Sequence, residues 1–179
     1  EEMTLLPGTI DLILVESDKD GTKAKKVNKF IMENHLRDSY DFIFIDCPPT
    51  ISVYTDAALI ASDFYLVPIR IDRYSILGIK LLKQVIDRLD DNEKIGIKPL
   101  GVVYTMVKEL TQKTLQLKET FERDDIVKEI GLFNNMTSYV NNLLVGYQGN
   151  ISSKYKKSRE DIKKICDEFL ERVASYESE

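Results

Sequence analysis

A single carboxylate follows directly on an apolar run in this chain: Asp46 comes after the residues FIFI at 42–45. A short, uninterrupted apolar run predicts a strand over 41–46 that is buried on both faces of a parallel sheet. Pro48 and Pro49 follow, so a helix cannot begin at once. Asp46 is therefore expected at the rim of the sheet, where open α/β sheets bind ligands and where a carboxylate can hold a metal-bound water. The alternative is that Asp46 only caps the following turn.

The elements that must position this carboxylate alternate along the chain. Further strands are expected at 64–69 and 100–107, with a weaker one at 131–136 and a short extended segment within 5–15. Because no hairpin signal separates these runs, right-handed crossovers through helices are expected, which predicts an α/β fold with a mainly parallel sheet. Thr55 and Ser158 are the predicted N-caps of their helices. The apolar periodicity predicts helices at 23–37, 55–61, 74–90, 111–129, 139–145 and 158–175. The predicted apolar stripe of the 74–90 helix includes Leu77, Leu81, Val85 and Leu89, and the predicted buried face of the 158–175 helix consists of Ile162, Ile165, Phe169 and Val173.

The length and composition of the chain indicate the broad class of protein. The chain has 179 residues, 43% of them apolar, and a net charge of −5, which predicts one domain over 1–179 and no global attraction to nucleic acid. Cys47 and Cys166 lie far apart, which favours free thiols in a reducing, cytoplasmic setting. His35, the one histidine, is expected on a helix surface. No apolar run is long enough to cross a membrane, so no membrane contact is expected.

Three stretches together resemble the ParA/MinD group of ATPases, and more closely its ParA (Soj) branch. They are YDFIFIDCPPT from Tyr40, DAALIASDFYLVPI from Asp56, and RYSILGIKLL from Arg73. The segment LGVVYTMV from Leu100 resembles the next strand of that family. The resemblance implies a three-layer P-loop NTPase-like fold with a mainly parallel sheet.

The chain departs from the family in one important respect. The P-loop is absent: none of the eight glycines stands in a G-x-x-x-x-G-K context. The backbone cradle and the lysine of that loop hold the triphosphate. We therefore expect a chain that lacks the N-terminal strands of the fold, corresponds to roughly the C-terminal two-thirds of a ParA-type ATPase, and binds no cofactor and hydrolyses no ATP by itself.

The resemblance assigns roles in the full-length parent, which would use ATP and Mg²⁺. Asp46 would accept a hydrogen bond from a water on the Mg²⁺, and Cys47 and Pro48 would belong to a switch that senses the γ-phosphate. Thr105 and Met106 would border the adenine, although Met106 has core packing as an equal alternative. Ser138 and Tyr139 are placed beside the adenine too, but an ordinary loop is the favoured alternative there, because the proline of the family's loop is missing.

A basic cluster precedes and opens the last helix. ParA-type dimers bind DNA without sequence preference through surface cations, so this cluster is the candidate DNA surface. The alternative is a solvated helix start whose charge Glu160 and Asp161 partly cancel. The cluster consists of Lys154, Lys156, Lys157, Arg159, Lys163 and Lys164.

Two functions follow from these observations. The first is a partition ATPase that dimerises with ATP, binds non-specific DNA on the nucleoid in the cytoplasm, and is stimulated by a ParB-like partner. The second is a non-enzymatic ParA-like remnant that serves as a protein-interaction module. The missing P-loop favours the second for this polypeptide, whereas the intact DCPP segment favours the first for its parent.

Overall fold

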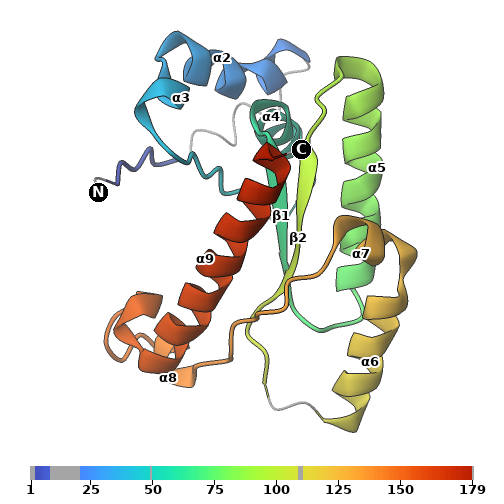
Figure 1. Ribbon diagram of the computed structural model, residues 1–179, viewed down its shortest axis with the longest axis vertical. Coiled ribbons are helices and arrows are strands. Elements are labelled where there is room, and N and C mark those ends of the chain that lie inside the picture. The colour runs from blue at the N-terminus through green and yellow to red at the C-terminus, as the bar shows by residue number, and fades with distance from the viewer. Residues whose placement is uncertain (1–2, 9–20, 49, 109–110, 179) are drawn as a thin grey trace.

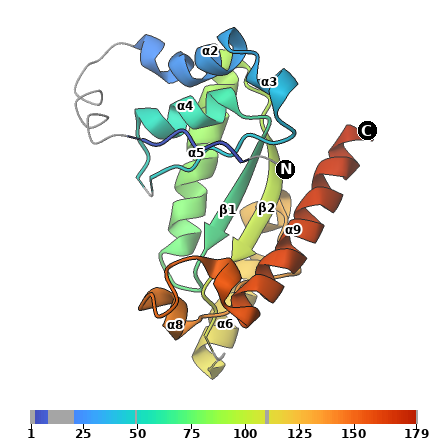
Figure 2. The ribbon, with the colours of Figure 1, turned by 90° about the vertical axis from the view of Figure 1, so that its left-hand side faces the viewer.

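The computed structural model describes residues 3–8, 21–48, 50–108 and 111–178. Two parallel strands, β1 (Phe64–Ile69) and β2 (Lys98–Tyr104), form the sheet. Helix α9 (Lys156–Glu177) lies on one side of them, and α5 (Ser75–Glu93) with α7 (Asp125–Ile130) lies on the other (Figure 1). Figure 2 shows the same layers turned by 90°. The predicted α/β class with a parallel sheet is therefore confirmed.

The segment 131–139 runs alongside β2 without forming a regular strand. It touches the strand and its extension through two parallel bridges, Val102 to Leu132 and Val107 to Ser138. Backbone hydrogen bonds of 2.8–3.0 Å join 131, 133 and 137 to Val102 and Tyr104. The predicted strand at 131–136 is thus an irregular third edge of the sheet, because side chains of α9 take up the backbone groups between the two bridges.

A β-bulge interrupts β2 at its first residues. Tyr65 pairs with Pro99 and Leu66 with Gly101, so Leu100 is left unpaired between them. An extra residue of this kind frees its backbone groups for other partners. Gly101 has φ +141°, and a Cβ there would lie 2.9 Å from Phe133, so glycine is required at this close approach. The bulge leaves the carbonyl of Leu100 free to meet α9.

Helix α5 confirms the predicted helix at 74–90 but buries a different part of its surface. Ile79, Val85, Ile86 and Leu89 are buried, whereas Leu77 and Leu81 of the predicted stripe are exposed. The carboxylate of Asp72 accepts hydrogen bonds from the backbone amides of residues 74 and 75 at 2.9 and 3.0 Å. Asp72 therefore satisfies amides that the first turn of a helix leaves unpaired.

Helix α4 (Val53–Ala61) begins earlier than the predicted helix at 55–61, and its N-cap is Ser52, not Thr55. The Ser52 hydroxyl accepts from the amide of Tyr54, and the Thr55 hydroxyl accepts from the amide of Ser52. The threonine thus contributes to a capping box from inside the helix. The prediction of a capped helix start is therefore right, but the N-cap is Ser52 and Thr55 is its partner in the capping box.

Two predicted helices are each broken. The helix at 23–37 is divided at His35, which adopts the left-handed conformation at φ 51°. The helix at 111–129 is divided at Asp124, whose side chain accepts from the amide of Ile126 and so caps a new helix. Its carboxylate also pairs with Lys80 of α5 at 3.0 Å. The pieces are η1 (Gly21–Lys25), α2 (Lys26–Glu33), α3 (Leu36–Ser39), α6 (Gln112–Arg123) and α7.

The predicted buried strand at 41–46 is wrong. These residues form no regular element, and Phe42 and Phe44 are 43% and 76% exposed. Both rings pack on Phe169 of α9, with centroids 5.5 and 5.7 Å from its ring. A strand needs a neighbour for its backbone hydrogen bonds. Among the described residues no segment pairs with 41–46, so it stays extended beside α9 without joining the sheet.

Helix α9 confirms the predicted helix at 158–175 but begins at Lys156. Its N-cap is Tyr155, and Ser158, the predicted cap, is buried inside the first turn. Of the predicted apolar face only Val173 is fully buried, whereas Asp161 and Glu168 are both buried. The short helix α8 (Asn141–Leu144) lies within the helix predicted at 139–145, whereas the short 3-10 helix η2 (Ser152–Lys154) was not predicted. The predicted extended segment within 5–15 lies mostly outside the described residues.

Candidate functional site

The chain bends at Met106, just after β2 ends, and then continues in the same direction, because Val107 still forms a parallel bridge with Ser138. The amide and hydroxyl of Thr105 both donate to the carbonyl of Ile69, at 2.7 and 3.0 Å, which ties the end of β2 to the end of β1. Met106 then takes the left-handed conformation at φ 53° and is 43% exposed. Its amide donates to the hydroxyl of Thr137 at 2.9 Å. Core packing, the alternative considered for Met106, therefore does not describe its side chain.

The loop that contains Ser138 and Tyr139 lies beside this bend. The amide of Val107 donates to the carbonyl of Thr137, and the amide of Tyr139 donates to the carbonyl of Val107, each at 2.9 Å. The ammonium of Lys108 lies 4.3 Å from the centroid of the Tyr139 ring. Four predicted site residues from two distant stretches, Thr105, Met106, Ser138 and Tyr139, thus meet at the carboxyl end of the sheet.

A cavity of about 300 Å³ opens at this edge. Residues 70–72 after β1 form one wall, residues 106–108 after β2 form another, and Thr114 of α6 completes it. The carboxyl ends of parallel strands are where open α/β sheets bind their ligands. The charged side chains that line the cavity are Arg70, Lys108 and Asp72, and neither cation forms an ion pair with a described carboxylate. The cavity therefore carries a net positive charge.

The residues of the DCPP segment lie apart from this network. Asp46 and Pro48 are exposed, in the extended segment that leads to α4, and Pro49 lies outside the described residues. Partial burial of the thiol, reinforced by the charge of Asp46, raises the pKa of Cys47. Among the described residues no hydrogen bond joins Asp46, Cys47 or Pro48 to the segment 105–107.

Possible metal-ligating side chains are numerous, but in the described part of the chain they are dispersed. Across the described part of the chain no three His, Cys, Asp or Glu side chains gather as a metal site. Mg²⁺ requires six oxygen ligands, supplied in nucleotide sites largely by waters and substrate phosphates. One exposed carboxylate, Asp46, does not satisfy that requirement, so the described residues by themselves do not fit a resident Mg²⁺.

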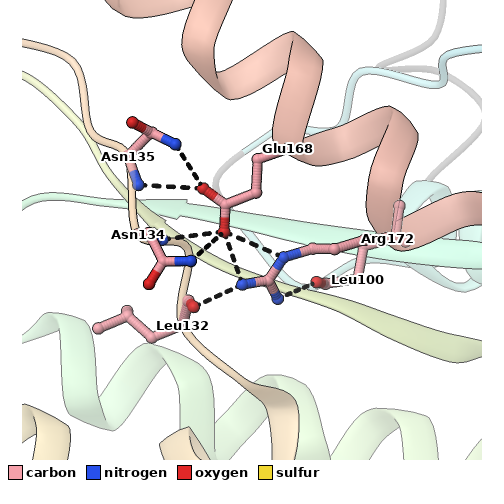
Figure 3. A network of polar contacts seen from close by, with 6 residues as sticks. All are labelled: Leu100, Leu132, Asn134, Asn135, Glu168 and Arg172. Carbon is pink, nitrogen blue, oxygen red and sulfur yellow. Dashed lines mark hydrogen bonds and ion pairs between the residues drawn. The ribbon is translucent and has the colours of Figure 1, made fainter. Parts of the chain in front are cut away.

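A buried carboxylate fastens the irregular third edge of the sheet to α9 (Figure 3). Glu168 accepts from the backbone amides of Asn134 and Asn135 at 2.9 and 3.1 Å, and from both of their side-chain amides. Arg172 pairs with the same carboxylate at 2.8 Å. The guanidinium also donates to the carbonyls of Leu100 and Leu132 at 2.8 and 2.6 Å. The bulge in β2, the segment 132–135 and α9 therefore share one polar network.

Asp161 makes a second attachment, two helical turns earlier on the same face of α9. One carboxylate oxygen accepts from the amide of Ser138 at 2.7 Å, and the other lies 3.3 Å from the ammonium of Lys157. From the sequence, Asp161 is expected only as one of two acids that partly cancel the charge of the basic cluster, and no role is predicted for Glu168. A signal was present, because both acids lie on the same face as Ile165 and so interrupt the apolar stripe of the helix.

The titration behaviour of these two acids follows from their partners. Burial alone would raise the pKa of Asp161, but the hydrogen bonds from Ser138 and the nearby Lys157 ammonium outweigh it and lower the pKa. The pKa of Glu168 is lowered in the same way, by Asn134, Arg172 and Asn135 against the effect of burial. Both groups are therefore held as carboxylates at neutral pH.

All six members of the predicted basic cluster are exposed: Lys154, Lys156, Lys157, Arg159, Lys163 and Lys164. Lys157 is the member with an ion pair, to Asp161. The exposed side of α9 also carries Glu160 and Asp167 among these cations. The cluster is thus accessible along one end of the helix, and acidic side chains dilute its charge.

Comparisons with known proteins agree with this architecture. A family described as an AAA domain matches residues 1–98. The sporulation initiation inhibitor protein Soj of Bacillus subtilis is 27% identical over 133 residues, which cover 73% of this chain and 53% of Soj. The chromosome partitioning protein ParA of Myxococcus xanthus is 31% identical over 104 residues, which cover 54% of this chain and 37% of that protein. The chain spans about half the length, or less, of these relatives.

Two solved structures share the fold. A plasmid partition protein from Borrelia burgdorferi superposes with a TM-score of 0.64 at 19% identity, over 93% of this chain and 61% of that one. A second putative plasmid partition protein from the same organism, bound to AMPPNP, gives a TM-score of 0.66 at 18% identity, over 93% of this chain and 64% of that one. Among the described residues, no helix has both the length and the apolar character needed to cross a membrane.

Proposed function

Because the chain belongs to the AAA domain family and is similar to ParA and Soj proteins, we propose that it is part of a ParA-type ATPase for plasmid or chromosome partition. In this proposal residues 1–179 form one domain of a parent that dimerises with ATP, binds non-specific DNA on the nucleoid, and hydrolyses ATP when a ParB-like protein stimulates it. The observation that carries the proposal is the meeting of Thr105, Met106, Ser138 and Tyr139 at the carboxyl edge of the sheet.

These four residues are proposed to border the adenine of ATP in the parent. Hydrogen bonds to Thr137 hold the backbone on both sides of the bend at Met106, which presents an exposed, flexible thioether. The ring of Tyr139 adds an aromatic face nearby. An apolar wall with a few fixed polar groups is the usual character of a site for a base.

The phosphate end of the site is proposed to need residues that this chain does not contain. Asp46, exposed in the DCPP segment, would accept a hydrogen bond from a water on the Mg²⁺, with Cys47 and Pro48 in the adjoining switch. Because the glycine-rich cradle and its lysine supply most of the attraction for the triphosphate, the chain alone is expected neither to hold ATP nor to hydrolyse it.

A fluorescent ATP analogue with Mg²⁺ tests this expectation on the chain itself. We expect no saturable rise in anisotropy with the wild-type chain, and the same result with Asp46→Asn. Micromolar binding that Asp46→Asn abolishes would contradict the proposal, because it would mean that this chain holds the phosphates without a P-loop.

The basic cluster on α9 is the proposed DNA surface. We expect binding of a DNA duplex to weaken steeply as salt rises, since released counterions dominate such contacts. The triple change of Lys156, Lys157 and Arg159 to Glu should abolish binding. A matched control reverses Lys26, Lys29 and Lys94, which belong to α2 and the end of α5 at the other end of the molecule (Figure 1). Equal loss in both triple variants would show a response to net charge alone.

The second candidate function is a non-enzymatic ParA-like remnant that acts as a protein-interaction module. The observation that favours it is the absence of a P-loop from the 179 residues. The reading frame upstream of Glu1 in the gene separates the two proposals. A P-loop encoded in frame supports the ATPase, and an in-frame start without one supports the remnant.

A further inference from the structure

One buried acid touches both of the surfaces to which the proposed function assigns ligands. Asp161 accepts from the amide of Ser138 at 2.7 Å, inside the loop beside Met106. Its other oxygen lies 3.3 Å from Lys157, a member of the basic cluster. The side chain of Asp161 is 9% exposed, whereas that of Lys157 is 64% exposed and open to a partner. A single carboxylate is therefore shared between a buried amide and a surface cation.

We propose that the Lys157–Asp161–Ser138 chain couples a polyanion on the basic cluster to the position of the 137–139 loop. This inference rests on the proposed function for the identity of the two ligands, DNA and nucleotide. The three groups form a continuous polar path from the surface of α9 to the loop beside the bend at Met106. The path continues through Val107, whose amide and carbonyl both bond to the loop that contains Ser138.

The direction of the effect follows from the shared acceptor. When a DNA phosphate engages the ammonium of Lys157, the carboxylate of Asp161 loses part of its compensating charge. Because that carboxylate remains buried, it must rely more strongly on the amide and hydroxyl of Ser138. DNA on the cluster thus tightens the loop, and by reciprocity a ligand that requires the tightened loop favours DNA.

The size of the coupling is limited by the ion pair that transmits it. Exposed ion pairs contribute little, so the two ligands should change each other's affinity by no more than about fivefold. Coupling of this size modulates binding and does not switch it on or off. Asp161 acts here as a positioning residue, because it reaches the proposed nucleotide site only through Ser138.

Amide resonances of the ¹⁵N-labelled full chain test the path without any ligand. Lys157→Gln should move the Ser138 amide resonance and slow its hydrogen exchange, because the carboxylate then serves one donor fewer. The control is Lys163→Gln, which removes an exposed charge from the same helix without touching Asp161 and should leave Ser138 unchanged. An unmoved Ser138 amide in Lys157→Gln, or an equal shift in both variants, overturns the coupling whether or not DNA binds.

A second arm adds a short DNA duplex to the same samples. The wild type should show a Ser138 shift that saturates with DNA. Lys163→Gln should bind DNA more weakly but show the same shift at saturation, and Lys157→Gln should bind without it. DNA binding by the wild type with no response at Ser138 overturns the inference. Absence of DNA binding, together with the Lys157→Gln shift of the first arm, would instead refute the DNA part of the proposed function and leave the polar path established.

Discussion

Replacing Glu168 by Gln removes one charge from the network that joins α9 to the sheet, and the structure sets the expected cost. Six hydrogen bonds end on the two oxygens of Glu168, four from Asn134 and Asn135 and two from Arg172. Glutamine retains one acceptor and turns an NH₂ group toward either the Asn134 or the Asn135 amide. The change therefore turns an NH₂ donor toward at least one partly buried backbone amide that had an acceptor, and it deprives Arg172 of its charged partner.

Breaking a buried, hydrogen-bonded ion pair from one side costs about 3–5 kcal/mol. The side chain of Glu168 is 8% exposed and that of Arg172 is 25% exposed, so water partly compensates the arginine. We therefore expect Glu168→Gln to lower the free energy of unfolding by about 3 kcal/mol. The free energy of unfolding of a native domain is only about 5–15 kcal/mol in total. A loss of this size should therefore be easy to measure in urea titrations followed by circular dichroism.

The matched control is Glu171→Gln, an exposed acid on the same helix. It removes the same charge and should change the free energy of unfolding by less than about 0.5 kcal/mol. If Glu168→Gln cost no more than Glu171→Gln, the network would not hold α9 to the sheet, and the reasoning would be wrong.

The pH dependence of stability independently checks that the ionised form of Glu168 is the stabilising one. The pKa of Glu168 is lower in the folded chain than in the unfolded one, where it is about 4.3. Its stabilising contribution is therefore complete above that value and is lost as the pH falls through the folded pKa. The stability difference between wild type and Glu168→Gln should be constant near neutrality and shrink below about pH 4. A difference that grew on acidification would contradict this assignment.

Replacing tyrosine by phenylalanine is expected to affect the free energy of unfolding differently at two positions. Tyr155→Phe should lower the free energy of unfolding by about 1 kcal/mol, because the hydroxyl accepts from the amide of Gln148 at 2.8 Å and donates to the carbonyl of Asn142 at 2.9 Å. Tyr104→Phe should leave it unchanged or raise it by up to about 1 kcal/mol, since that buried hydroxyl has no partner among the described residues. Urea titration of both variants decides the matter, and a larger loss in Tyr104→Phe than in Tyr155→Phe would refute the hydrogen-bond assignment.

The parts of the fold that were predictable from sequence are those whose partners lie within the chain. β1 matches the predicted strand at 64–69, and α5 and α9 match predicted helices to within a few residues at each end. The resemblance to ParA and Soj proteins, read from residues 40–82, is confirmed by relatives of those names. Apolar periodicity predicted these elements correctly because each of them either belongs to the sheet or packs on one of its faces.

The predictions that the structure contradicts failed for a different reason. The run at 42–45 has the composition of a buried strand, but composition does not state whether a neighbouring strand is available. The breaks at His35 and Asp124 depend on a single backbone conformation and a single capping hydrogen bond, which periodicity does not register. Of the candidate site, the meeting of Met106 with Tyr139 was expected from the family resemblance alone. The bond from Asp161 to Ser138 was not foreseen, because an acid near a helix start is ordinarily solvated.

The attachment of α9 also dictates an order of events during synthesis. Arg172 reaches back 72 residues to Leu100, and Glu168 reaches back 34 residues to Asn134. Long loops of this kind must close before their contacts contribute any stability. On the ribosome, β1, β2 and the helices between them are exposed well before the last helix emerges. The third edge of the sheet therefore stays unattached until α9 itself has been translated and has left the ribosome.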